Sequence, residues 1–390
     1  MYPLIRWLMT DARRHADPNQ FLEAFANELR AAGVDVARVT TGVPILHPQI
    51  FSFSGLWELG KGTTERFYRA SAAAMATMSN SPIRIAYEGG GPSRFDLVAP
   101  KSEGEFPILE ELRRDGYTDY VVYAVPFADG SFKALSLATK NARGFRDDEF
   151  SLFEAMIPAV AFNLEVQALR RTARTLLDTY VGQQSGGRVL EGQIQRGSGE
   201  TIRAVIWLCD LRGFTSLSEA LTRDALIELL NAYFGPMCDA VTAEGGEVLK
   251  FIGDAMLAIF PLREDAAGTC ARALAAARRA QAALAAENER REAARLPRIE
   301  YGLALHIGDV MYGNIGSDIR LDFTVIGPAV NLTARIESMC RQLGQQLLLS
   351  SDFVKAGGMS ARSFGRHALK GVGADQEIFG PISPAKVLPG

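Results

Sequence analysis

The N-terminal part of the chain alternates between helical and strand-like patterns of apolar residues. Between Pro18 and Ala32, apolar side chains recur at steps of three and four residues, which predicts an amphipathic helix. Short apolar or alternating runs predict strands at residues 34–43, 50–59, 120–127 and 133–139. The last two runs flank an Ala-Asp-Gly-Ser segment that is typical of a hairpin turn. Together these elements predict a small α+β domain over residues 1–150.

A long helix is predicted from Asp147 to Tyr180, where apolar residues again follow three- and four-residue steps. Pro158 is expected to kink it. The apolar stripe has two interpretations: a parallel dimeric coiled coil, which we favour, or burial against its own domain. The Gly-, Gln- and Ser-containing sequence from Gly182 to Gly199 should then end the helix and form a linker. Residues 151–199 are therefore predicted to be a helical connector, a signalling helix followed by a linker.

The C-terminal part begins with an apolar run from Ile202 to Cys209, which predicts a buried strand. This strand ends in Asp210, and a turn at Gly213 leads into a helix that is expected to begin near Thr215. Backbone N–H groups at such a helix start point outward and can bind a polyphosphate. Phe214 and Thr215 are therefore candidate substrate-binding residues.

A second acidic residue lies at a predicted hairpin tip about forty residues further along. The segments at residues 247–251 and 255–260 predict two strands of a β-hairpin, and Gly253 and Asp254 lie between them. Two carboxylates at the ends of neighbouring strands can hold two magnesium ions, one for a hydroxyl nucleophile and one for phosphate oxygens. Asp210 and Asp254 are therefore candidate metal ligands.

Four segments make the C-terminal half recognisable as a known type of domain. They are Asp-Leu-Arg-Gly-Phe-Thr at 210–215, Lys-Phe-Ile-Gly-Asp at 250–254, His-Ile-Gly-Asp-Val-Met-Tyr-Gly-Asn-Ile-Gly at 306–316 and Asp-Phe-Thr-Val-Ile-Gly-Pro-Ala-Val-Asn-Leu-Thr-Ala-Arg at 322–335. In order and spacing they resemble the catalytic domain of class III adenylate and guanylate cyclases. The resemblance implies a ferredoxin-like βαββαβ domain over residues 200–382. The N-terminal α+β domain resembles GAF or PAS-like sensor modules, which implies an unknown ligand or regulator.

The cyclase resemblance assigns roles to individual residues. It makes Asp210 and Asp254, with a backbone carbonyl near Leu211, the ligands of two Mg²⁺ or Mn²⁺ ions in each site. Lys250 matches the purine-selecting lysine of the family, because its ammonium can donate to adenine N1, whereas guanine N1 carries a proton. Guanylate cyclases have an acidic residue at this position, so Lys250 favours ATP. Thr324 is the second purine position, and its hydroxyl can serve adenine or guanine.

The remaining matches concern the phosphates and the dimer. Asn331 and Arg335 are four residues apart on one helical face, and they match the pair that positions the ribose and stabilises charge on the α-phosphate. Lys370 resembles a lysine that contacts the terminal phosphates. The family takes the metal carboxylates from one subunit and the purine, Asn and Arg groups from the other, which implies a homodimer. In this family the 3′-hydroxyl of the substrate attacks the α-phosphorus in line and pyrophosphate leaves. The rate therefore depends on positioning the reacting groups and on neutralising charge.

Composition excludes several other classes of protein. A formal net charge of -3 provides no basic surface for nucleic acid, and four widely separated cysteines suggest neither a disulfide framework nor a zinc site. No stretch approaches about eighteen consecutive apolar residues. We therefore expect no membrane span and a cytoplasmic location.

Three alternatives stay open at this point. The first is a guanylate cyclase or a cyclase of mixed specificity, since Thr324 is compatible with both purines. The second is a catalytically inactive nucleotide-binding module, although no expected metal, Asn or Arg position is lost. The third places a haem in the N-terminal half, where His15 and His47 could supply ligands.

Overall fold

The computed structural model describes residues 2–15, 17–44, 50–69, 79–101, 104–263 and 265–382, with only the backbone at 43, 44, 50–53 and 67–69. These residues divide into two compact units, Met1–Leu176 and Leu177–Gly390. His47, one of the two histidines considered for a haem, lies outside the described residues.

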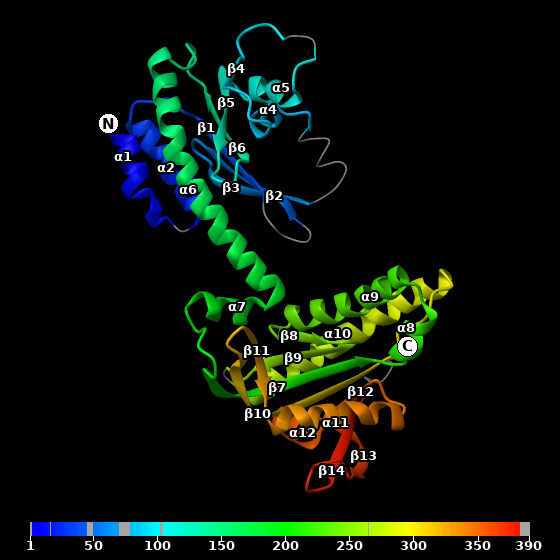
Figure 1. Ribbon diagram of the computed structural model, residues 1–390. Coiled ribbons are helices and arrows are strands. Elements are labelled where there is room, and N and C mark those ends of the chain that lie inside the picture. Colours follow the sequence, from blue (N-terminus) through cyan, green and yellow to red (C-terminus); the bar gives the residue numbers. More distant parts are fainter. Residues whose placement is uncertain are drawn as a thin grey trace, which may run out of the picture. The chain divides into compact units, whose positions relative to one another are not determined.

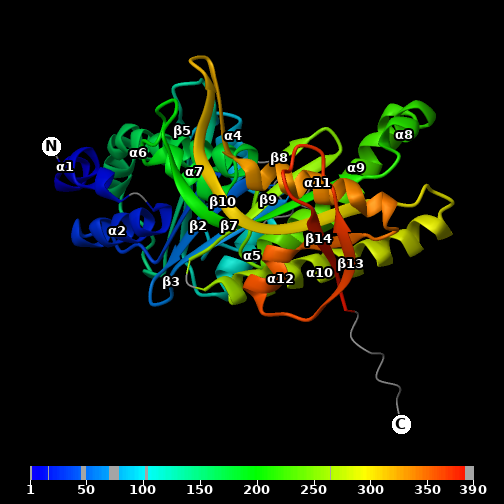
Figure 2. The same cartoon turned by 90° about the horizontal axis from the view of Figure 1, so that it is seen from below.

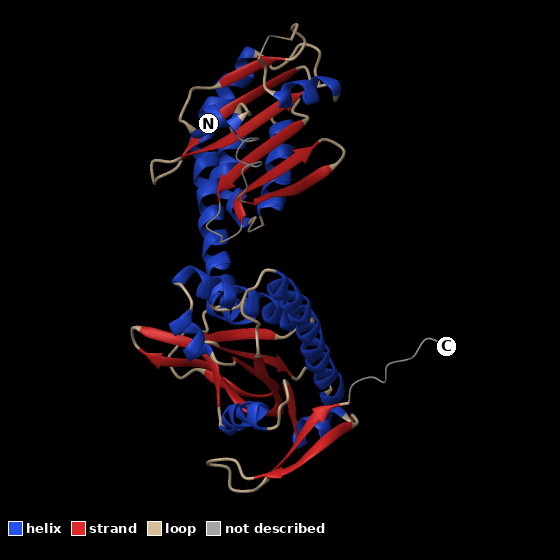
Figure 3. Cartoon of the chain, turned by 90° about the vertical axis from the view of Figure 1, so that its right-hand side faces the viewer, coloured by secondary structure: helices blue, strands red, loops and turns tan. Residues whose placement is uncertain are grey.

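The N-terminal unit is built on a six-stranded antiparallel sheet with helices on both faces (Figures 1 and 3). The strand order is β3-β2-β1-β6-β5-β4. The strands are β1 (Arg38–Pro44), β2 (Ile50–Glu58), β3 (Gly62–Arg69), β4 (Ser93–Asp96), β5 (Asp119–Pro126) and β6 (Phe132–Thr139). The helices are α1 (Pro3–Thr10), the 3₁₀ turn η1 (Ala12–Arg14), α2 (Pro18–Ala31), α4 (Ile83–Tyr87), α5 (Pro107–Arg114) and α6 (Asp147–Tyr180).

Strand β5 shows why both faces of this sheet are covered. Val121, Tyr123 and Val125 are buried in one apolar cluster with residues of α1, α2 and α6. Tyr120 and Val122 point to the other face and are buried with residues of α5. Alternate side chains of a strand point to opposite faces, so a strand that is apolar throughout requires a helical layer on each side. The predicted amphipathic helix and the four predicted strands of this half are confirmed within a few residues.

Helix α6 occupies the residues predicted for it, Asp147–Tyr180. Ten of its residues are buried, the last of them Gln167. By length and composition α6 could span a membrane, since one window has mean hydropathy 1.3, but half of that window is buried inside the fold. The buried Asn163 donates from Nδ2 to the carbonyl of Leu8 at 2.8 Å. The part of α6 up to Gln167 therefore belongs to the core of the N-terminal unit.

The C-terminal unit has a central sheet in the order β13-β14-β12-β10-β7-β9-β8, and β11 forms a long hairpin with β10 (Figure 2). The four strands β10-β7-β9-β8, with helices connecting β7 to β8 and β9 to β10, are the expected ferredoxin-like βαββαβ core. The elements are α7 (Gln183–Leu190), β7 (Gly199–Leu211), α8 (Phe214–Ala220), α9 (Arg223–Ala243), β8 (Glu247–Ile252), β9 (Ala255–Pro261), α10 (Ala266–Ala293), β10 (Tyr301–Ser317), β11 (Arg320–Ile326), α11 (Pro328–Gln342), β12 (Leu347–Ser350), α12 (Ser351–Gly357), β13 (Ala361–His367) and β14 (Gln376–Pro381).

The central strand β7 is covered on both faces. Val205, Trp207 and Cys209 are buried with apolar residues of α9 and α10. Ala204 and Ile206 are buried on the opposite face with residues of β10, β11 and α11. The apolar run that predicted this strand is therefore continuous because the strand lies in the middle of the sheet.

The predicted linker from Gly182 to Gly199 is wrong in one part. Gly182, with φ +98°, does break the helix, but Gln183–Leu190 forms the additional helix α7. Its Gly186 is buried, and a Cβ there would lie 3.0 Å from the backbone carbon of Leu177. The glycine that suggested a flexible linker thus permits close packing, and tertiary contacts form a helix that local propensity does not predict.

Candidate active site

The two candidate metal-binding carboxylates lie next to each other. Asp210 on β7 is in register with Ala255 on β9, and Asp254 precedes Ala255 at the tip of the β8–β9 hairpin. Burial, followed by the charge and hydrogen bond of Asp254, raises the pKa of Asp210 to about 6. Two adjacent carboxyl groups, where the charge of one raises the pKa of the other, are a donor set suited to a divalent cation. Leu211, whose carbonyl is the third candidate ligand, is the last residue of β7.

Side-chain ligands alone do not complete this site. Within the described ranges no group of three or more His, Cys, Asp or Glu side chains is arranged to hold a metal ion. A cation on Asp210 and Asp254 would take its other ligands from backbone, water or substrate oxygens, as Mg²⁺ commonly does in phosphate-binding sites.

A third acidic residue, Glu337 on α11, lies close to this pair and was missed by the sequence analysis. Burial, with the charge of Asp210 next in size, raises the pKa of Glu337 to about 7. Gly302 is in register with Asp210, and a Cβ on Gly302 would collide with Oε1 of Glu337. The sequence did carry a signal, because Glu337 shares a helical face with the buried residues Thr333 and Cys340.

Helix α11 presents its two candidate catalytic residues on the other side. Asn331 and Arg335 are exposed and four residues apart. Arg335 and Glu337 are two residues apart, which separates them by about 200° around a helix with 3.6 residues per turn. Since Glu337 faces the carboxylate pair of its own chain, Arg335 faces away from that pair.

The two candidate purine-binding residues lie on strands that meet at one edge of the unit. Lys250 on β8 places Nζ 3.2 Å from Oδ2 of Asp322 on β11. Thr324 follows two residues later and shares a strand face with Asp322. The Thr324 side chain is buried, and its hydroxyl has no hydrogen-bond partner in the described part of the chain. Its hydrogen-bonding capacity is therefore free to serve another group.

The candidate phosphate-binding residues are divided between two places. Phe214 and Thr215 begin α8 directly after Gly213, whose φ of +71° turns the chain out of β7. Lys370 is exposed in the turn between β13 and β14. Because β13 and β8 are the two edges of the sheet, Lys370 and Lys250 are not brought together within one chain.

Comparison with known proteins matches the C-terminal half to one family. Residues 199–375 match the family model of the adenylate and guanylate cyclase catalytic domain. The C-terminal half carries a class III cyclase catalytic domain.

The relatives of this cyclase domain include both specificities. An adenylate cyclase of Anabaena cylindrica is 39% identical over 166 residues, which are 42% of this chain and 32% of that protein. The structure of the adenylyl cyclase CyaB from P. aeruginosa is 26% identical with a TM-score of 0.45, and the match covers 49% of this chain and 100% of that one. The guanylyl cyclase Cya2 is 33% identical with a TM-score of 0.43, and the match covers 49% of this chain and 98% of that one. The chain therefore spans about a third of the Anabaena relative's length.

His306 of the cyclase domain is a packing residue. Its side chain is buried, and Nδ1 lies 2.8 Å from Oγ of Ser350. Burial lowers the pKa of His306 to about 4. The imidazole is therefore neutral near pH 7 and is held by a structural hydrogen bond.

Proposed function

We propose that this protein is an adenylate cyclase that converts ATP to 3′,5′-cyclic AMP and pyrophosphate in the two equivalent sites of a homodimer. The observation that carries the proposal is the orientation of α11, which directs Glu337 toward the carboxylates of its own chain and exposes Asn331 and Arg335. Exposed catalytic residues that face away from their own carboxylate pair can serve the pair of a second subunit.

In this site each residue has a defined task. Asp210 and Asp254 would hold two Mg²⁺ or Mn²⁺ ions, and ions bound there would supply positive charge for the polyphosphate and lower the pKa of the 3′-hydroxyl. Asn331 orients the ribose, and Arg335 stabilises the charge that develops on the α-phosphate. Phe214 and Thr215 offer backbone N–H groups to the phosphates, and Lys370 contacts the terminal ones.

Selection of ATP rests on Lys250 and Thr324. The Lys250 ammonium has three donor hydrogens, of which the contact with Asp322 engages one, so donors are left for adenine N1. The hydroxyl of Thr324, which has no hydrogen-bond partner among the described residues, can accept from the adenine amino group. The same hydroxyl can donate to the guanine carbonyl, which makes mixed specificity the second candidate function.

Exposed residues of α6 support the proposed dimer and its regulation. Phe162, Leu169 and Leu176 are 43%, 65% and 38% exposed and recur every seven residues. A heptad spacing of exposed apolar residues is the pattern of a coiled-coil seam. The second half of α6 is then a parallel coiled coil, through which the sensor-like N-terminal unit regulates a cytoplasmic enzyme.

Subunit complementation tests the shared site. The Asp254→Ala and Arg335→Ala chains should each be inactive with ATP and Mg²⁺ or Mn²⁺, and their mixture should regain one working site per heterodimer. An Asp210→Ala and Asp254→Ala mixture is the matched control and should stay inactive, because both changes affect the same half-site. Confirmed heterodimers without recovered cyclic AMP, identified by mass, would show that the site is built within one chain.

A further inference from the structure

A buried hydrogen-bond cluster joins α7 to two strands of the catalytic sheet. Glu247 is 5% exposed and accepts at Oε1 from the backbone N–H and the hydroxyl of Ser185, at 2.8 and 2.7 Å. Its Oε2 accepts from the hydroxyl of Tyr312 at 2.8 Å. The hydroxyls of Ser185 and Tyr312 are 3.0 Å apart, which closes the cluster. Burying a carboxyl group costs free energy unless its oxygens are hydrogen-bonded. The three donors therefore offset the cost of burying the Glu247 side chain.

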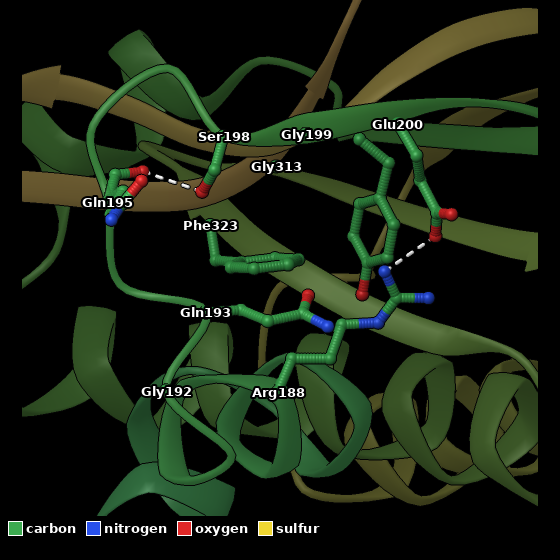
Figure 4. A pocket seen from close by; sticks show the side chains of 10 residues that line it. Arg188, Gly192, Gln193, Gln195, Ser198, Gly199, Glu200, Gly313 and Phe323 are labelled. Carbon is green, nitrogen blue, oxygen red and sulfur yellow. Dashed lines mark hydrogen bonds and ion pairs between the residues drawn. The ribbon is translucent and has the colours of Figure 1, made fainter.

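Residues Gly182 and Arg188 pack closely around this hydrogen-bond cluster. A Cβ on Gly182 would lie 3.2 Å from Oε1 of Glu247, and the φ of Gly182 is +98°, a conformation that glycine adopts most readily. Arg188 lies over the ring of Tyr312, 4.8 Å from its centroid, and donates to Glu200 at 2.6 Å. Figure 4 shows Arg188 reaching from α7 to Glu200 across a cavity of about 300 Å³ that Phe323 and Gln193 also line.

The cluster contacts both strands that carry the purine-binding candidates. Glu247 is the first residue of β8, three residues before Lys250. Tyr312 packs edge-on against Phe323 of β11, with ring centroids 4.8 Å apart and planes at 84°. Phe323 is the neighbour of Thr324. A shift of Ser185 or Glu247 would therefore move the strands that hold the two purine-binding side chains.

We propose that Ser185, Glu247 and Tyr312 are positioning residues for the purine: they fix β8 and β11 relative to each other and thereby set the placement of Lys250 and Thr324. This inference rests on the proposed nucleotide cyclase function. We assign these three residues no contact with the substrate. They act through the backbone of the two strands, so their loss should weaken nucleotide binding more than it slows the chemical step.

The test is a comparison of KM and kcat in the full-length protein. Glu247→Gln keeps the shape of the side chain but turns one acceptor into a donor that faces the Ser185 or Tyr312 donors. We expect KM for ATP to rise about tenfold with a smaller change in kcat, because misplacement of substrate groups is costly. Tyr312→Phe removes only one donor, so it should fold and raise KM in the same direction.

Asn288→Ala is the matched control. Asn288 is also buried in this unit, and it exchanges hydrogen bonds of 2.9 and 2.7 Å with the backbone of Ile299, away from β8 and β11. It should lower Tm without changing KM. Wild-type KM in folded Tyr312→Phe and Glu247→Gln, or an equal rise in Asn288→Ala, would overturn the positioning role.

A second readout separates this inference from the proposed function. Affinity for a fluorescent ATP analogue, N-methylanthraniloyl-ATP, should fall in Tyr312→Phe by the same factor as KM rises. A wild-type protein that binds the analogue but makes no cyclic nucleotide from ATP or GTP would refute the proposed function alone. Unchanged affinity in both cluster variants would refute the positioning role alone.

Discussion

Replacing Asp254 by Asn should stabilise the metal-free protein near pH 8 while removing its cyclase activity. The carboxylates of Asp210 and Asp254 lie side by side at the ends of neighbouring strands. Without a cation, the negative charge of Asp254 repels the carboxylate of Asp210 once Asp210 has lost its proton. Asn is close to Asp in shape but carries no charge, so the repulsion is lost together with a metal ligand.

The size of the gain follows from the raised pKa of Asp210, which moves from 3.8 to about 6. One pKa unit corresponds to about 1.4 kcal/mol, so the whole shift is worth at most about 3 kcal/mol. Burial is the larger cause, and the carboxyl is only partly buried, so the share that belongs to Asp254 is about 1 kcal/mol. A gain of this size would raise Tm by about 2–4 °C in a domain of this length.

The sign of the pH dependence is fixed by linkage. A carboxyl whose pKa is raised on folding binds its proton more tightly in the folded state, so the folded state loses stability as pH rises from about 4 to about 6. This loss of folding stability is complete at pH 8 and only partial at pH 5. Asp254→Asn should therefore gain more at pH 8 than at pH 5.

Thermal unfolding in the presence of a chelator, at both pH values, measures this difference. Asp309→Asn is the control, because Asp309 is exposed and pairs with Arg203 at 3.3 Å, so its loss should give no gain at pH 8. The reasoning is refuted if Asp254→Asn is no more stable than wild type at pH 8, or if its gain is as large at pH 5.

Three further outcomes are expected. Inserting one residue after Leu169 rotates the chain downstream by about 100° and should strongly change cyclase activity, whereas seven residues nearly restore the register; similar activities in both soluble variants would mean that α6 does not couple the units. His306→Gln should keep the wild-type kcat and its pH profile from pH 6 to 8, because the pKa of His306 is lowered to about 4 and the imidazole is neutral in that range. Its Tm should fall because the contact with Ser350 is lost, and a large fall in kcat would assign His306 a catalytic role. Lys250→Glu should lower kcat/KM for ATP relative to GTP by about tenfold or more, measured by product mass, and an unchanged ratio would remove Lys250 from purine selection.

Several features of this protein were accessible from local sequence alone. The apolar run before Asp210 and the paired runs around Asp254 predicted the strands β7, β8 and β9, and the structure has them within a few residues. Strands β7 and β9 can be predicted because a buried strand must be apolar along its own length, whatever it packs against. The helix from Asp147 to Tyr180 could also be predicted from local sequence, because its helical period of apolar residues lies within one continuous segment.

Other features depend on contacts between residues that are distant in sequence. Ser185 and Glu247 are 62 residues apart, and Ser185 and Tyr312 are 127 apart, yet they share one buried hydrogen-bond cluster. A local pattern shows Ser185 only as part of a Gly- and Gln-containing linker and Glu247 only as a polar residue at the start of a strand. The close packing that makes Gln183–Leu190 a helix was likewise invisible.

The sequence by itself determined the strands β1, β2 and β5 to β9 and the cyclase motifs, because each of them depends on residues that are neighbours in the chain. Only the tertiary structure decided that Glu337 lies beside the carboxylate pair and that Arg335 faces away from it. The physical reason is that both depend on how α11 packs against the sheet, and the burial and the nearby charge that raise the pKa of Glu337 exist only after that packing.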